Sequence, residues 1–205
     1  MKRFLNLNTV YIVAVIIVLG VLFIPRAVDI YNLRTQGINY FTNDIENYHN
    51  NAHPIEGEYT IEIDLNNLEN NKGKVLFDDG ENQIYVSKVI AHNTNEYELF
   101  FRSSGSSSLG GATIISGVEH KHNNDGLISK FQAKAKATYR GDTYKLSPSE
   151  YSGLNYSDVD EFGFYLELPE ELVPDFEEEG MIDVAVTNLY INLWAKKSFW
   201  TNGAG

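Results

Sequence analysis

Two histidines that lie two residues apart, His120 and His122, are the residues of this chain best placed for metal chemistry. They fall in a segment with strand character (VEHKH). Side chains at positions i and i+2 of a strand point to the same face of the sheet, and imidazole nitrogens are common zinc ligands. The pair therefore predicts a candidate zinc site. The alternative is a pair of solvated side chains at a strand end beside a hairpin.

An acidic stretch that begins like a calcium-binding loop is the second candidate metal site. Asp158, Asp160 and Gly163 match positions one, three and six of such a loop. The match then fails, because Phe162 and Pro169 stand at positions five and twelve, where oxygen ligands are required. We expect a calcium site of another kind at the edge of the sheet, or a solvated turn without a metal. No other cofactor is expected.

The serine- and glycine-rich stretch 103–111 (SSGSSSLGG) is the candidate binding loop. These residue types favour loops and turns, and loops on a rigid β scaffold commonly carry binding sites. The stretch lacks lysine and does not lead from a strand into a helix, as a phosphate-binding loop would. We expect a mobile hairpin loop, either as a plain connection or as a lid over a ligand. Its candidate contact residues are Ser104, Gly105, Ser106, Ser107, Ser108 and Gly110.

Three lysines, Lys130, Lys134 and Lys136, alternate with apolar and mainly small residues between Ser129 and Tyr139. The alternation predicts a strand with one basic face and one small apolar face. The basic face is either a receptor for an anionic partner or a solvated surface that prevents edge pairing. Alanines on the other face imply that a bulky group packs against them.

The residue patterns of the chain do not predict catalysis. It has no cysteine, no serine in a G-x-S-x-G motif and no H-E-x-x-H motif. Carboxylates are plentiful, but glycoside hydrolysis needs two of them across a cleft, and a sequence alone cannot pair them. We therefore expect a protein that is not an enzyme. An envelope hydrolase that uses carboxylates is the least favoured alternative.

The elements that must position these residues begin with an uncharged apolar run from Thr9 to Ile24, which Pro25 and Arg26 close. A membrane-spanning helix needs about 17–25 mainly apolar residues, so a span over residues 9–25 is long enough. A cleaved signal peptide needs small residues before the cut, and the segment offers only a poor site of this kind. We expect an uncleaved anchor rather than a cleaved signal or a buried core helix.

Lys2 and Arg3 precede the apolar run, which favours a cytoplasmic N-terminus under the positive-inside tendency. We therefore expect a single-pass protein of the cell membrane, with residues 1–8 in the cytoplasm. Residues 26–53 would form a juxtamembrane stalk helix, and residues 54–205 an extracytoplasmic β domain. The lipid bilayer is thus the first expected partner.

Five apolar residues mark one face of the expected stalk helix. Their steps are seven, three, four and three residues, which is helical or heptad-like spacing. The face either packs against the chain's own domain or forms a short association seam between copies. The five residues are Tyr31, Ile38, Phe41, Ile45 and Tyr48.

Beyond the stalk, apolar residues recur with a period of two, which is typical of half-buried strands. Turn residues separate the segments, as at Asn123-Asn124-Asp125-Gly126. The last strand, from Ile182 to Trp194, changes its apolar parity near Thr187-Asn188, which predicts a β-bulge. Two short helices are expected, near residues 147–151 and 169–176.

These elements predict a mainly β fold. A transmembrane helix and an amphipathic stalk helix would precede an antiparallel β-sandwich or jelly-roll-like domain. The alternative is an α+β arrangement in which a curved sheet packs on the stalk helix.

The part of the chain after Arg26 is strongly acidic, since it holds all 28 acidic residues and fewer basic ones. A nucleic-acid-binding protein needs a basic surface, so nucleic acid is not expected as a partner. We expect a membrane-anchored binding or adaptor domain that is a subunit of a bacterial cell-envelope assembly. Its partner would be another envelope protein or a second copy of itself.

An apolar N-terminal helix that runs on as an amphipathic helix into a β domain resembles the general plan of pilin-like proteins. The resemblance covers residues 1–50 and implies, as an alternative function, a structural subunit of a surface filament. The chain departs from the pilin pattern because its apolar run has no glutamate at the start and no peptidase-type glycine before it.

Overall fold

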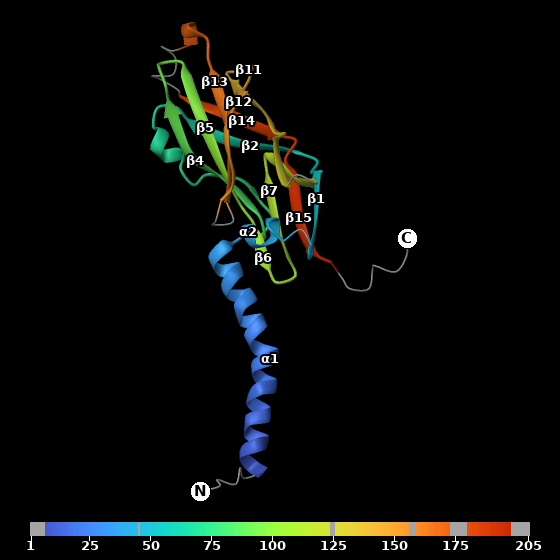
Figure 1. Cartoon of the computed structure of the whole chain (residues 1–205). Coiled ribbons are helices and arrows are strands. Elements are labelled where there is room, and N and C mark those ends of the chain that lie inside the picture. Colours follow the sequence, from blue (N-terminus) through green and yellow to red (C-terminus); the bar gives the residue numbers. More distant parts are fainter. Residues whose placement is uncertain (1–6, 45, 124–125, 156–158, 173–179, 198–205) are drawn as a thin grey trace.

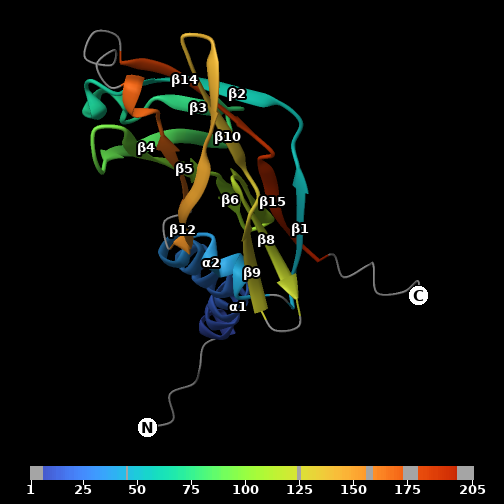
Figure 2. The same cartoon turned by 90° about the horizontal axis from the view of Figure 1, so that it is seen from above.

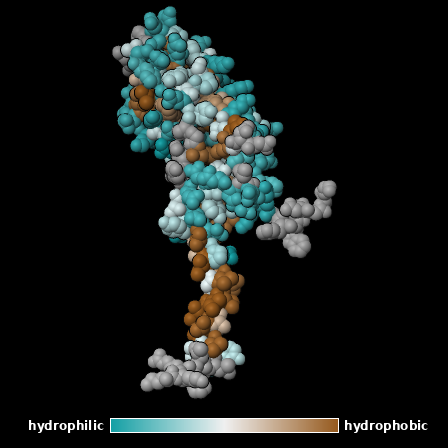
Figure 3. All heavy atoms as spheres, viewed as in Figure 1, coloured by the Kyte–Doolittle hydropathy of each residue, from teal (hydrophilic) through white to brown (hydrophobic). Residues whose placement is uncertain are grey.

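The computed structural model describes residues 7–44, 46–123, 126–155, 159–172 and 180–197. Its first element is the helix α1 (Leu7–Gln36), which continues through Pro25 and projects from the rest of the chain as a rod (Figure 1). The segment Asn8–Gln36 is long and apolar enough to cross a membrane, and its most apolar window is not buried in the structure. The apolar rod contrasts with the mainly hydrophilic domain that follows it (Figure 3).

After the helices, the described chain is mainly β, with its strands in antiparallel sheets. The largest sheet, sheet C, contains in spatial order β12 (Ser147–Asn155), β13 (Val159–Glu167), β5 (Glu96–Ser104), β4 (Gln83–Ala91) and β3 (Val75–Asp78). Sheet B contains β11 (Asp142–Lys145), β10 (Lys134–Tyr139), β14 (Met181–Thr187) and β2 (Glu58–Asp64). A β-sandwich after an N-terminal helix, as the sequence predicted, is confirmed.

Sheets B and C lie as two layers, which Figure 2 shows from above. One cluster of buried apolar side chains from both sheets forms the main core. Phe101, Phe162 and Phe164 stack or meet edge to face within it, with ring centroids 5.6–6.2 Å apart. The alanines of β10 are buried in the same core, while its lysines are exposed. The alanine face thus packs in a core that also contains bulky aromatic groups.

Sheet A contains β1 (Tyr48–Pro54), β15 (Tyr190–Lys196), β7 (Gly111–Ser116) and β6 (Ser106–Ser108). The chain passes from β14 into β15 through Asn188, whose φ of 59° is left-handed. The expected β-bulge within one long strand is wrong: the change of parity near Thr187-Asn188 marks the passage between two strands, because β14 pairs in sheet B and β15 in sheet A. The ribbon of β8 (Val118–Asn123) and β9 (Gly126–Phe131) forms a separate two-stranded sheet.

A short helix, α2 (Asn39–Thr42), joins α1 to the domain. Ile38 and Phe41 are buried in a second, smaller core against Ala112, Ile114 and Trp194. Phe41 also meets the ring of Tyr48 edge to face at 5.0 Å. The apolar helix is therefore joined to the domain by a packed junction rather than by a free linker.

The predicted stalk helix over residues 26–53 is wrong beyond Gln36. Gly37 adopts a left-handed φ of 55°, and its N–H donates to the carbonyl of Leu33 at 2.9 Å, which ends α1. Residues 48–54 form β1 instead, because their backbone pairs with β15 along seven residue pairs. The domain therefore begins at the end of α1, well before residue 54.

The two expected short helices are also corrected where the structure describes them. Residues 147–155 form β12, which pairs with β13 and is extended at Pro148 as proline allows on a sheet edge. Within 169–176, a single 3-10 turn covers Glu170–Leu172. Residues 173–176 lie outside the described residues.

Candidate functional site

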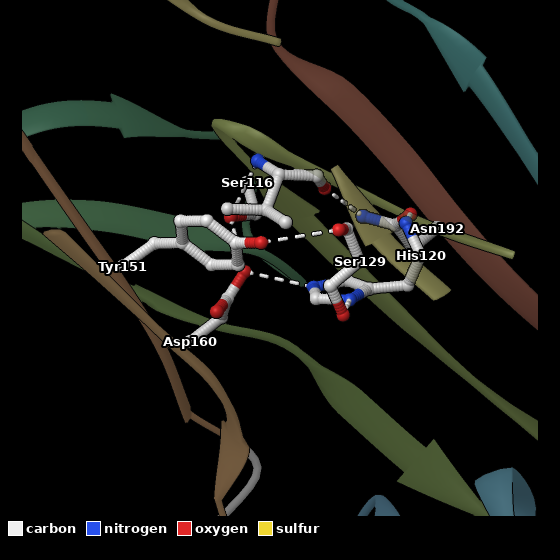
Figure 4. A network of polar contacts seen from close by, with 7 residues as sticks. Ser116, His120, Ser129, Tyr151, Asp160 and Asn192 are labelled. Carbon is white, nitrogen blue, oxygen red and sulfur yellow. Dashed lines mark hydrogen bonds and ion pairs between the residues drawn. The ribbon is translucent and has the colours of Figure 1, made fainter. Parts of the chain in front are cut away.

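A buried polar network joins the β8–β9 ribbon to sheets A and C (Figure 4). At its centre, His120 has no exposed surface. Its Nε2 lies 2.9 Å from Oδ2 of Asp160, and its Nδ1 lies 2.7 Å from Oγ of Ser129. Asp160 is also fully buried and accepts a hydrogen bond from the hydroxyl of Ser116 at 2.5 Å. Three strands, β7, β8 and β13, thus meet at one carboxylate, and β9 meets them through the imidazole.

The proton positions in this network follow from the donor and acceptor types. An ionised carboxylate only accepts, so Nε2 of His120 carries the hydrogen that lies toward Asp160. In a neutral imidazole, Nδ1 is then the acceptor, and the hydroxyl of Ser129 donates to it. The hydroxyl oxygen of Ser116 in turn accepts from the N–H of Val118 at 3.1 Å. Every contact has one donor and one acceptor.

A serine, a histidine and an aspartate in a row have the composition of a hydrolase triad. In such a triad the imidazole takes a proton from the serine and then delivers it to the leaving group of the substrate. The imidazole of His120 has no exposed surface, whereas Ser129 is half-buried. A leaving group cannot contact the imidazole in this arrangement. The geometry therefore fits a joint between strands better than it fits acyl transfer.

Two asparagine side chains replace strand pairing along the outer edge of β8. The amide of Asn192 in β15 accepts from the N–H of His120 at 2.7 Å and donates to the carbonyl of Val118 at 2.9 Å. Asn50 in β1 accepts from the N–H of His122 at 3.0 Å. A side-chain amide carries the same donor and acceptor as a peptide group. Sheet A thus holds the ribbon by side chains that imitate a neighbouring strand.

The predicted metal ligands do not form a site in the part of the chain that the structure describes. No group of three or more metal-ligating side chains is found among those residues. Both ring nitrogens of His120 are occupied, by Ser129 and Asp160. Burial lowers the pKa of His122, which favours the neutral imidazole that a metal requires, but no group of ligands surrounds it among the described residues. Asp160 faces the buried network instead of a calcium loop, and Asp158 lies outside the described residues.

The expected mobile loop at 103–111 is a paired hairpin instead. Ser104 ends β5, and Ser106–Ser108 form β6, which pairs with β7. Glycine serves close backbone approach here, because a Cβ on Gly105 would lie 1.9 Å from the carbonyl oxygen of Thr113. The hairpin still borders a groove of about 380 Å³. Four of the candidate contact residues line this groove: Ser106, Ser107, Ser108 and Gly110.

Gly111→Ala is expected to destabilise this hairpin. Gly111 has a φ of 154°, and an added Cβ would lie 2.1 Å from the carbonyl oxygen of Trp194 in β15. Relief of such a clash requires β7 and β15 to separate, at a cost of about 1–3 kcal/mol. Urea unfolding of the full chain in an uncharged detergent measures the loss. Gly110→Ala is the matched control, since its nearest neighbour is the flexible Ser108 hydroxyl at 3.5 Å; equal losses in both variants would contradict the prediction.

The residues of the expected association face separate into two groups. Ile38, Phe41 and Tyr48 are at most 4% exposed, because they pack in the smaller core of their own chain. Burial raises the pKa of Tyr48, so its hydroxyl stays neutral there. Tyr31 is 67% exposed on α1, and Ile45 lies outside the described residues. The structure favours packing on the chain's own domain over a seam between copies.

Sequence reasoning missed three members of the buried network: Ser116, Ser129 and Asn192. One signal was present for Asn192, which lies two residues before the buried Trp194 and therefore on the inward face of its strand. A polar residue at an inward position needs a buried partner. The serines carry no such signal, because their partners come from strands far away in the sequence.

Comparison with known protein families, with curated proteins and with solved structures finds no match.

Proposed function

We propose that this chain is a single-pass protein of a bacterial cell membrane whose β domain binds another component of the cell envelope. The N-terminus would lie in the cytoplasm and the domain outside. The protein would act as an adaptor or as the binding subunit of an envelope assembly, without catalysis of its own.

The observation that carries this proposal is the packed junction between the apolar helix and the β domain. Two residues separate α1 from α2, and Phe41 of α2 has no exposed surface. The helix from Pro25 to Gln36 rises about 16 Å at 1.5 Å per residue. The domain is thus held at a set height above the bilayer and in a set orientation. This geometry suits a module that presents a surface to a partner.

The buried network supports a role without catalysis. His120 and Asp160 are used to hold strands together, and neither has exposed surface with which to meet a substrate. An enzyme of the Ser–His–Asp kind would need its imidazole at the surface.

The first test is the topology of the chain in intact cells. The chain has no cysteine, so a single introduced cysteine reports its own location. Ser107→Cys places a thiol on the exposed β6 of the domain. We expect a membrane-impermeant maleimide to label Ser107→Cys in intact cells and to label Asn6→Cys only after the membrane is opened. The reverse pattern would refute the proposed orientation.

The second test asks what the domain contacts. A photo-crosslinking amino acid is placed at Thr143, which is exposed on β11, or at Tyr31 on α1. We expect the Thr143 position to capture another envelope component, identified by mass spectrometry. Products that contain only this chain, and that form only from Tyr31, would refute the adaptor role and favour the filament subunit.

A further inference from the structure

Three lysines meet on the exposed face of sheet B and are called here the lysine cluster. Lys134 and Lys136 belong to β10, and Lys145 belongs to β11. The register places Lys136 directly opposite Lys145. Directly opposed side chains lie about 5 Å apart at Cβ, and residues two apart on a strand lie about 7 Å apart. All three side chains are exposed on the same face.

This arrangement opposes stability, since like charges directly opposite one another in a ladder repel. The cluster is unexpected from the composition of the chain, which has 28 acidic residues and only 16 basic ones. One ion pair in the described residues involves the cluster: Nζ of Lys136 lies 2.9 Å from Oε2 of Glu58, with both side chains nearly half exposed. Such an exposed pair contributes little. A bound anion would relieve the repulsion that remains.

The surface beside the cluster suits a thin ligand. The lysines border a shallow groove of about 160 Å³, with Ala185 and Thr187 of β14 and Glu58 of β2 beside them. The residues that line this groove include no aromatic ring. Protein partners usually depend on aromatic or arginine anchors in pockets, whereas lysine binds phosphate as a flexible point charge. The same face also carries Asp183 and Glu62, which are opposite each other in the ladder, so its positive charge is confined to the lysine cluster.

The position of the cluster in the molecule limits the source of the ligand. β11, β14 and β2 lie at the end of the domain opposite to α1 (Figure 1). A helix that anchors the chain in a bilayer therefore holds the cluster away from that bilayer. Phospholipid headgroups of the same membrane are out of reach, so the anion comes from beyond the membrane surface.

We propose that the lysine cluster is a binding site for an anionic polymer of the envelope that carries phosphodiester groups. The inference rests on the proposed binding role and adds the chemical class of the ligand. The chain of the polymer lies along β10, with successive phosphates near Lys134 and near the Lys136–Lys145 pair.

The test uses the full chain in an uncharged detergent, with inorganic polyphosphate as the probe. Lys145→Glu replaces the repulsive pair by an attractive one. We expect it to raise the Tm without ligand by about 1–4 °C and to lower the affinity for polyphosphate about tenfold. If Lys145→Glu is more stable than the wild type but binds polyphosphate less tightly, the lysines serve ligand binding rather than the stability of the fold. Lys134→Gln, which creates no new pair, is expected to weaken binding without raising the Tm.

Lys196→Glu is the matched control, because Lys196 is an exposed lysine on sheet A. It should leave polyphosphate binding unchanged. Equal binding by wild type and Lys145→Glu would overturn the proposal, as would a lower Tm in Lys145→Glu. Tighter binding of poly-L-glutamate than of polyphosphate would assign the site to an acidic protein segment and overturn it too. If photo-crosslinking at Thr143 still captures another envelope component in any of these cases, the proposed function is supported while this inference fails.

Discussion

Asp160→Ala is expected to lower the free energy of unfolding of the domain by about 3–5 kcal/mol. The carboxylate of Asp160 accepts from Nε2 of His120 and from the hydroxyl of Ser116, and all three groups are buried. Without it, two donors remain in an apolar interior with no acceptor, and a cavity adds to the cost. Urea unfolding of the full chain, followed by tryptophan fluorescence, measures the change.

Two control variants separate the buried network from general effects of charge or of lost hydroxyls. Asp142→Ala removes an exposed carboxylate of β11 and should change stability by less than about 0.5 kcal/mol. Ser129→Ala removes the half-buried hydroxyl at the other end of the network and should cost about 1 kcal/mol. A loss for Asp160→Ala no larger than that for Asp142→Ala would show that the network does not hold the strands together.

Phe41→Ala is expected to release the apolar helix α1 from the domain. Phe41 is fully buried against residues of sheet A that include Tyr48 and Trp194, and a buried phenylalanine contributes about 3–5 kcal/mol. The smaller core has few members, so this loss is enough to undock α2. We expect amide hydrogen exchange to rise in α2 and at the start of β1, while the core between sheets B and C stays protected.

The control for this variant is Tyr31→Ala, which removes an aromatic ring of α1 that is 67% exposed. It should leave exchange in α2 unchanged. If Phe41→Ala also leaves exchange in α2 unchanged, the junction is not held by this core, and the set orientation of the domain loses its support.

The sequence predicted the local pattern of the β domain well, because period-two alternation depends on which face of a strand is buried. The alternation in β10 follows from residues near one another in the chain. The bulge expected at Thr187-Asn188 is instead a passage between two sheets, which local spacing cannot show. The prediction of a stalk helix beyond Gln36 was wrong for the same reason, because the structure there depends on residues far away in the chain. Tyr48 satisfies helical spacing with Phe41, yet it lies in β1, because the partner that makes 48–54 a strand is β15, more than a hundred residues later.

The candidate site was predictable only in part, for a related reason. The spacing of His120 and His122 correctly indicated one strand face, but it could not show that Ser129 and Asp160 occupy the imidazole of His120. The serine-rich stretch has the composition of a loop, and its pairing with β7 becomes visible only in three dimensions. The charge of a strand face, by contrast, was predicted correctly, since the exposed face of β10 is basic as expected.

The ladder between β1 and β15 has a mechanical consequence. β1 follows α2 along the chain, and it runs roughly along the long axis of the molecule (Figure 1). A partner that pulls on the far end of the domain would therefore load this ladder along its strands. Force in that direction is shared by all seven residue pairs from Tyr48↔Lys196 to Pro54↔Tyr190 at once, instead of opening them one after another. The ladder would therefore resist a pull along the long axis of the domain.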